Sequence, residues 1–93
     1  VIDAKSTNPA LLYQAANYYF TNNKDQNQAY TWIKQSTESD PKYWTLHLQA
    51  KIELSLGKKT AALESATRSK KLAEEGKNQD YVGLNDRLIK SIK

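Results

Sequence analysis

The sequence predicts an all-α fold, an antiparallel repeat array of two helix pairs followed by a C-terminal capping helix. Three observations support this prediction. Asn, Asp, Pro and Gly residues stand at positions typical of helix starts and ends. Apolar residues between them recur every three or four positions, the period of a helix that is buried on one face. The small residues of the second helices also recur after 33 residues.

Two capping signals define the first helix pair. Asn8 can cap a helix that begins at Pro9, where a missing N–H is harmless, and that runs to about Thr21. Asp25, with Gln28 three positions on, has the spacing of a capping box for a second helix that ends near residue 39. The buried faces are predicted to be Leu12, Ala15, Ala16, Tyr19 and Phe20, then Ala29, Trp32, Ile33 and Ser36.

The remaining three helices follow from the same signals. Asp40 and Pro41 repeat the cap-then-proline pattern and predict a third helix, which Gly57 closes as a left-handed C-cap. A fourth helix is expected from residues 58–60 to Gly76, and Asn78 can cap a fifth that reaches residue 92. Their apolar stripes are Trp44, Leu48, Ile52 and Leu56, then Ala62, Leu63, Ala66, Ser69, Leu72 and Ala73, then Tyr81, Leu84, Leu88 and Ile92.

The internal repeat is clearest in the second helices. At an offset of 33 residues the aligned pairs are Ala29 with Ala62, Ile33 with Ala66 and Ser36 with Ser69. Small side chains at these places let two helices approach closely. The first helices align once a one-residue difference in the turn is allowed, so that Asn17 falls on Ala50 and Leu12 lies near Leu46. The repeat favours an array over an irregular bundle.

These positions resemble the tetratricopeptide repeat, a helix–turn–helix unit of about 34 residues. The first unit matches at Tyr13, Ala16, Asn17, Phe20, Ala29, Ile33, Ser36 and Pro41, the second at Ala50, Gly57, Ala62 and Ser69, and the last helix at Tyr81, Leu84 and Leu88. Glu53 departs from the pattern, since an aromatic residue is expected there, and the second unit lacks the closing proline. The resemblance implies an array whose first helices line a concave surface, with the fifth helix as its cap.

A second resemblance is to the C-terminal helical part of a family of bacterial envelope proteins, classified only as a domain of unknown function. The stretches that carry it are AAxYYF (15–20), AxxWI (29–33), YWxLxxQAKxEL (43–54), LGKKxxAL (56–63) and DYVxLNxxLI (80–89). In that family the helical part follows a signal peptide and a β-rich domain. The resemblance therefore implies an exported, periplasmic parent chain and supplies no activity.

The length and composition indicate one domain of a longer protein. The chain has 93 residues with no cysteine and no methionine, so disulfides and thiolate metal sites are excluded and the chain is expected to be a processed form or an excised part. We expect residues 1–8 to be a linker from a missing upstream part and residues 9–93 to be the helical domain. No apolar run approaches the roughly 20 residues of a membrane span.

The sequence predicts no catalytic, cofactor or metal site. His47 is the single histidine, and no HExxH, GxSxG or phosphate-loop pattern is present. Asp40 and Glu53 are the oxygen ligands nearest to His47 in the sequence, and neither shares its helical face. The chain is therefore expected not to be an enzyme.

Charge gives a second, weaker candidate function. The net charge is +4, with −1 on residues 1–40 and +5 on residues 41–93. The basic residues at and around the fourth helix are Lys58, Lys59, Arg68, Lys70, Lys71 and Lys77. Such a cluster can bind nucleic acid, but Glu64, Glu74 and Glu75 interrupt it and no base-reading motif accompanies it. We therefore rank nucleic-acid binding below protein binding.

Protein docking is the function that the pattern favours. In an array of this kind the groove-facing positions would be Gln14, Tyr18 and Thr21, then Trp44, His47, Lys51 and Ser55, then Val82, Asp86 and Lys90. From these we select Gln14, Tyr18, Trp44, His47, Lys51 and Lys90 as candidate contacts to a protein or peptide partner, which includes the upstream domain of the same chain. Burial of Tyr18 and Trp44, either against neighbouring helices inside the fold or against the missing upstream domain, is the competing interpretation for these two. The alternative function is a structural spacer or cap without a partner of its own.

Overall fold

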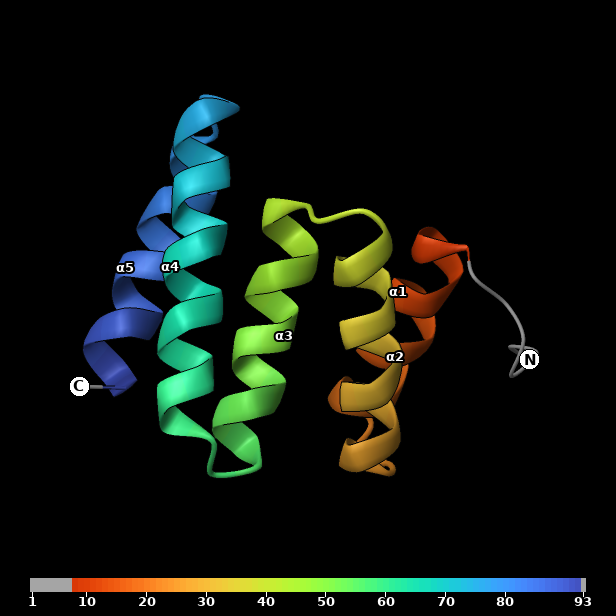
Figure 1. Cartoon of the computed structure of the whole chain (residues 1–93). Helices are drawn as coiled ribbons and strands as arrows, with labels where there is room; N and C mark the ends of the chain where they lie inside the picture. The colour runs from red at the N-terminus through yellow and green to blue at the C-terminus, as the bar shows by residue number, and fades with distance from the viewer. Residues whose placement is uncertain (1–7, 93) are drawn as a thin grey trace.

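A computed structural model of the chain describes residues 8–92, and it confirms the all-α antiparallel array (Figure 1). The helices in this part of the chain are α1 (Pro9–Thr21), α2 (Gln26–Ser39), α3 (Tyr43–Ser55), α4 (Lys59–Glu75) and α5 (Gln79–Ile92). The predicted linker, apart from Asn8, and the last residue of the predicted domain lie outside the described residues.

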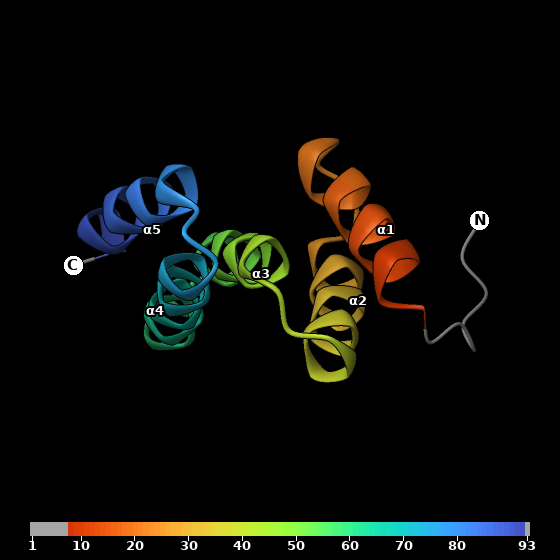
Figure 2. The same cartoon turned by 90° about the horizontal axis from the view of Figure 1, so that it is seen from above.

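The helices form two layers. Each helix packs mainly on its neighbours in the sequence, and α3 also contacts both α1 and α5. Seen from above, α1, α3 and α5 lie toward one side of the array and α2 and α4 toward the other (Figure 2). The first helices of the pairs therefore share a face. Within residues 8–92, no helix combines the length and the hydropathy that crossing a bilayer requires.

Three predicted N-caps are confirmed, one of them Asn78 before α5, whose Oδ1 accepts from the Tyr81 amide at 3.2 Å. Asn8 Oδ1 accepts from the Ala10 amide at 2.9 Å, and Asp25 Oδ1 accepts from the Gln28 amide at 3.1 Å. Each side chain satisfies an amide that the first helical turn leaves without a partner.

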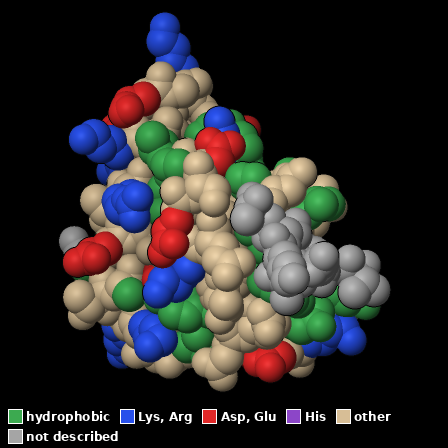
Figure 3. All heavy atoms as spheres, turned by 45° about the vertical axis from the view of Figure 1, so that its right-hand side comes forward, with side chains coloured by type: hydrophobic (Ala, Val, Ile, Leu, Met, Phe, Trp, Pro, Cys, Tyr) green, Lys and Arg blue, Asp and Glu red, His purple; other side chains and the backbone are tan. Residues whose placement is uncertain are grey.

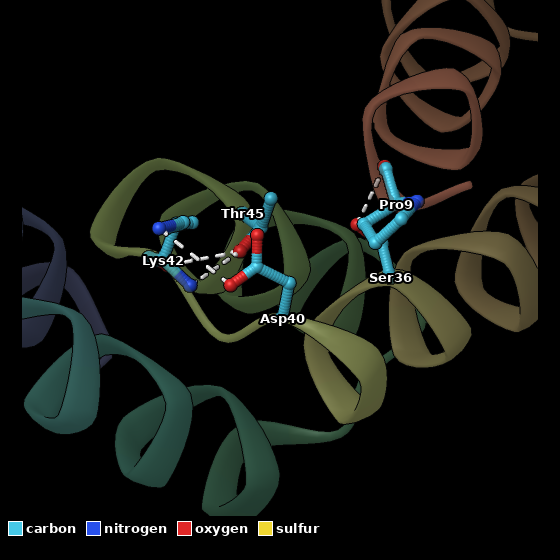
Figure 4. A network of polar contacts seen from close by, with 5 residues as sticks. All are labelled: Pro9, Ser36, Asp40, Lys42 and Thr45. Carbon is cyan, nitrogen blue, oxygen red and sulfur yellow. Dashed lines mark hydrogen bonds and ion pairs between the residues drawn. The ribbon is translucent and has the colours of Figure 1, made fainter. Parts of the chain in front are cut away.

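The predicted start of the third helix is wrong by two residues, because Asp40 ends α2 instead of starting α3. The Asp40 amide donates to the Ser36 carbonyl at 2.9 Å, and α3 begins only at Tyr43. The start of α3 is secured by Thr45, whose Oγ1 accepts from the Lys42 amide at 3.1 Å and donates to the Lys42 carbonyl at 2.9 Å (Figure 4).

The turns that follow α1, α3 and α4 each use one residue with positive φ. Gly57 has φ +80°, which confirms its prediction as the left-handed residue after α3. Gly76 ends α4 as predicted but has φ −84°, and the neighbouring Lys77 takes the left-handed conformation instead, with φ +58°. Asn23 does the same after α1, with φ +53°. Two of the three turns therefore place a side chain in a conformation that favours glycine.

Small and branched side chains fill the interface within each helix pair. The buried apolar residues include Leu12, Ala16, Ala29 and Ile33 in the first pair, and Leu46, Leu48, Ala50, Ile52, Ala62, Ala66 and Ala73 in the second. Most of the predicted faces are thus confirmed. Leu84 is the exception, since it is 41% exposed and the buried residue of α5 is Asn85. Ala15 and most of the large side chains of these faces, among them Tyr19, Phe20, Trp32 and Leu72, are half-buried.

The internal repeat is visible as one recurring hydrogen bond. Ser36 Oγ donates to the carbonyl of Pro9, and Ser69 Oγ donates to the carbonyl of Tyr43. Pro9 and Tyr43 are the first residues of α1 and α3, so each second helix is fixed to the start of its first helix by the same contact. Figure 4 shows the contact of the first pair, between Ser36 and Pro9. We call this contact the serine staple.

The staple also sets the register of the first helices. Pro9 and Tyr43 are 34 residues apart, whereas the two serines are 33 apart. Ala16 therefore corresponds to Ala50, and both are fully buried. The predicted match of Asn17 with Ala50 is wrong by one residue. The extra residue lies in the turn, which has four residues after α1 and three after α3.

Candidate functional site

Side chains from three helices meet on the side of the array formed by α1, α3 and α5. We call Tyr13 on α1, Trp44, His47 and Lys51 on α3, and Tyr81 on α5 the first-helix face. All five are half-buried. The three α3 residues are three and four positions apart, so one stripe of the helix presents them together.

Aromatic contacts hold this face together. Tyr43 packs on Trp44 at 4.8 Å and on Tyr81 at 4.9 Å between ring centroids, and His47 packs edge-on against Tyr81 at 5.6 Å. Burial raises the pKa of the Tyr81 phenol, and the neighbouring Tyr13 and Tyr43 raise it further. The rings of α3 and α5 thus form a fixed aromatic surface.

A small pocket opens beside this surface, at the N-terminal ends of α1 and α3. Its volume is about 70 Å³, and Tyr13 and Trp44 stand among its walls. Lys42 occupies the rim, because its Nζ lies 3.6 Å from an Asp40 oxygen and 5.9 Å from the centre of the Trp44 ring (Figure 4). The walls are Pro9, Ala10, Tyr13, Ser36, Asp40, Lys42, Trp44 and Thr45.

His47 is positioned by a chain of hydrogen bonds that crosses from α3 to α5 and α4. Its Nδ1 lies 2.7 Å from Asn85 Oδ1, and Asn85 Nδ2 donates to Ser69 Oγ at 2.8 Å. Ser69 completes the chain through its serine staple to Tyr43. Burial lowers the pKa of the His47 imidazole, the Asn85 hydrogen bond opposes this, and the charge of Lys51 lowers the pKa again. The imidazole is therefore neutral at pH 7.

The charged side chain of the first-helix face is Lys51, so the face carries a positive charge. α1 contains no charged residue. Lys51 Nζ lies 5.6 Å from the centre of the Phe20 ring, so its stem crosses from α3 to α1. The carboxylate of α3, Glu53, is 2% exposed and belongs to the interior. The face thus offers aromatic area, one imidazole and one ammonium.

Three of the six predicted contact residues join this face and three do not. Trp44, His47 and Lys51 come together as expected. Gln14 is exposed on α1, and Tyr18 is 55% exposed with Lys24 Nζ 5.5 Å from its ring centre.

Helix geometry separates these side chains from the first-helix face. At about 100° per residue, Tyr18 points roughly 140° away from Tyr13 and Lys90 roughly 180° away from Tyr81. Lys90 is exposed, as expected from this geometry. Packing inside the fold is therefore excluded for Tyr18.

Two residues of the face, Tyr13 and Tyr81, were not among the predicted contacts. The repeat resemblance matched both to aromatic positions, and the predicted apolar stripe of the fifth helix included Tyr81; in the structure each is half-buried. A helical wheel of α3 centred on His47 does not contain these two residues. Their closeness to His47 depends on how α1 and α5 pack against α3, and the sequence does not give that packing.

A buried polar cluster lies behind the face, between α2, α3 and α4. Glu53 accepts hydrogen bonds from Tyr30 Oη at 2.9 Å, Gln49 Nε2 at 3.1 Å and Ser65 Oγ at 2.6 Å. Thr37 Oγ1 extends the cluster by donating to Gln49 Oε1 at 2.7 Å. Burial, followed by the hydrogen bond and the charge of Glu53, raises the pKa of Tyr30 to about 12. Because Glu53 has no access to solvent, this carboxylate ties helices together and is closed to a substrate.

The basic residues of α4 do not form an unbroken surface. Lys70 Nζ pairs with Asp86 at 2.7 Å, and in the view of Figure 3 acidic side chains stand among the basic ones. Depressions on the outer surfaces of α2 and α4 are each lined by one helix alone, so neither is a cleft between elements. Among residues 8–92, no three His, Asp or Glu side chains are grouped as metal ligands would be.

Comparisons with protein-family models, with curated proteins and with solved structures find no match for this chain. The function must therefore be argued from the first-helix face itself.

Proposed function

We propose that this chain is a non-catalytic docking module, related to tetratricopeptide arrays, that binds a segment of a partner protein on the first-helix face. The observation that carries the proposal is the convergence of Tyr13, Trp44, His47, Lys51 and Tyr81 from three helices onto one half-buried surface. Aromatic rings supply contact area at a low entropic cost, and the imidazole and ammonium supply directional polar contacts.

Two further features support docking over catalysis. Among the groups with shifted pKa values, Tyr30 is paired with the buried Glu53 and Lys70 is paired with Asp86, while the side chain hydrogen-bonded to His47 is the amide of Asn85, which is neither an acid nor a base. General acid–base chemistry needs a second group within hydrogen-bond reach of a substrate. The pocket between α1 and α3 is also small, at about 70 Å³, and suits one side chain of a partner better than a cofactor.

Site-specific photo-cross-linking tests the proposal. A photoreactive amino acid at Lys51, on the first-helix face, is compared with the same amino acid at Thr67, which is exposed on the outer surface of α4. In an extract of the source cells, we expect one discrete cross-linked partner from position 51 and none from position 67. Equal labelling from both positions, or none from either, would favour the alternative of a spacer that packs on the upstream part of its own chain.

A further inference from the structure

The hydrogen-bond directions around His47 follow from two backbone carbonyls in the chain of hydrogen bonds, those of Tyr81 and Tyr43, because a carbonyl oxygen can only accept. Asn85 Nδ2 lies 2.9 Å from the Tyr81 carbonyl oxygen, which can only accept. The amide nitrogen of Asn85 must therefore face Tyr81, and its Oδ1 must face His47. Since Oδ1 only accepts, His47 Nδ1 carries a proton.

The other ring nitrogen is open. Nδ1 is occupied by Asn85, and Nε2 makes no hydrogen bond within residues 8–92. Within residues 8–92, the side-chain polar atom that is both buried and without a hydrogen-bond partner is Gln26 Oε1. His47 Nε2 also has no partner in this range but is not such a buried atom, so it is accessible to solvent. In the neutral imidazole the proton sits on Nδ1, and Nε2 is therefore a hydrogen-bond acceptor.

From this geometry we infer, on the basis of the proposed function, that the partner presents an uncharged hydrogen-bond donor to His47 Nε2 and that acid releases it. The donor is a hydroxyl, a side-chain amide or a backbone N–H. A lysine or arginine of the partner is disfavoured there, because Lys51 stands one helical turn away on the same stripe and its charge already acts on the imidazole.

Protonation changes the face and leaves the fold intact. Nδ1 donates to Asn85 in both the neutral and the charged imidazole, so the contacts to α4 and α5 persist. Nε2 changes from acceptor to donor, and a second positive charge appears beside Lys51. Both changes repel the donor of the partner. Because the pKa of His47 is lowered, release is expected below about pH 6.5, the ordinary value for histidine.

The other titratable groups that face His47 are three phenols and one ammonium. They are Tyr43 and Lys51 on α3, Tyr81 on α5 and Tyr13 on α1. α4 contributes the neutral Ser69. Of the carboxylates on α3, α4 and α5, Asp86 pairs with Lys70 and Glu53 is buried with Tyr30, whereas Asp80, Glu64, Glu74 and Glu75 are exposed. None of these carboxylates contributes to the shift of the His47 pKa.

The first experiment uses the free protein. Long-range ¹H–¹⁵N correlation of the His47 ring at pH 8 should show the proton on Nδ1, and titration should give a pKa below 6.5. A proton on Nε2 would overturn the inference, because the open nitrogen would then be a donor. Lys51→Gln should raise the measured pKa, since it removes a neighbouring positive charge.

The second experiment uses a random peptide library without Asp, Glu or His, so that pH acts on the protein alone. Peptides selected at pH 8 should shift the amide resonances of Tyr13, His47 and Tyr81. For the wild type, their affinity should fall about tenfold one pH unit below the measured pKa of His47, and it should not depend on pH for His47→Gln. Lys51→Gln should move the midpoint of release to higher pH.

The outcomes separate the two proposals. Peptides that bind the first-helix face with the same affinity at pH 5 and pH 8 would leave the docking function standing and overturn the role of His47. Peptides that perturb only α2 and α4, or a library that yields no binder, would overturn the docking function and this inference with it.

Discussion

The two helix pairs share the same contacts between their helices and differ in the other residues of their interiors. Each has a serine staple and a pair of fully buried alanines at its centre, Ala16 with Ala29 in the first pair and Ala50 with Ala62 in the second. The first pair then uses apolar side chains, with Ile33 fully buried beside Tyr19 and Trp32 in one core cluster. The second has Ala66 at the position of Ile33 and places the carboxylate of Glu53 in its interior.

The difference teaches how a short array can be both stable and specific. Apolar burial in the first pair supplies free energy without direction. The polar cluster around Glu53 joins α2, α3 and α4 through bonds that form in only one arrangement, so it fixes how the second pair sits on the first. The substitutions below test this division, from the largest expected effect to the smallest.

Ile33→Ala should have the largest effect. It removes a fully buried side chain from the apolar cluster, and such truncations cost about 3 to 4 kcal/mol of unfolding free energy. Urea denaturation followed by circular dichroism measures the loss. Leu84→Ala is the matched control, since Leu84 is 41% exposed and should cost less than about 1 kcal/mol. Equal losses for the two variants would contradict the assignment of the core.

Glu53→Ala should come next, at about 2 to 3 kcal/mol, because it leaves the donors of Tyr30, Gln49 and Ser65 without their acceptor. Glu53→Gln retains one acceptor oxygen and should lose about half as much. The same denaturation experiment applies. If Glu53→Ala were neutral, the cluster would contribute nothing to holding the pairs together.

The two staples should differ when each is broken. Ser36→Ala removes one hydrogen bond, and about 1 kcal/mol is expected. Ser69→Ala also deprives Asn85 of an acceptor, so about 2 kcal/mol is expected. Hydrogen exchange of the His47 and Tyr81 amides should increase only for Ser69→Ala. An increase in both variants would show that the staples act on the whole array.

The turns offer a smaller contrast. Gly57→Ala should cost about 1 kcal/mol, because φ at this position is positive. Lys77→Gly should instead add roughly 0.5 kcal/mol, since Lys77 already holds a positive φ without being glycine. Thermal melting distinguishes the expected loss of stability in Gly57→Ala from the expected gain in Lys77→Gly. A loss of stability in Lys77→Gly would show that the lysine side chain has another role.

The contribution of Tyr30 is tested by alkaline pH, because it does not change between neutral pH and pH 10. The pKa of Tyr30 is about 12 in the folded protein and about 10 when unfolded. Its neutral phenol therefore contributes stability that is complete below pH 10 and is lost as pH rises through 12. The stability difference between the wild type and Tyr30→Phe should shrink across this range. A constant difference would mean that Tyr30 does not donate to Glu53.

The helices could be predicted from the sequence because their signals are local. Caps such as Asn8 and Asp25 and the turn at Gly57 act within a few residues, and all three are confirmed. Asp40 misled the prediction because the same signal can end one helix or start the next, and the choice depends on the Ser36 carbonyl in the preceding turn.

The site could be predicted only in part. The α3 stripe of Trp44, His47 and Lys51 follows from periodicity within one helix. Tyr13 and Tyr81 depend on how α1 and α5 are rotated about their axes, which tertiary contacts decide. Glu53 was noticed as a departure from an aromatic pattern, but its three donors come from three helices and no local signal joins them.

The serine staple has a consequence for engineering. It anchors the C-terminal half of one helix to the first carbonyl of another, so it fixes how the two helices of a pair meet without help from neighbouring pairs. A designer who wished to lengthen this array could therefore copy the pair as a module, keep the serine and the turn length that belongs to it, and vary the outward side chains freely. The resulting series would show how curvature grows with each added unit.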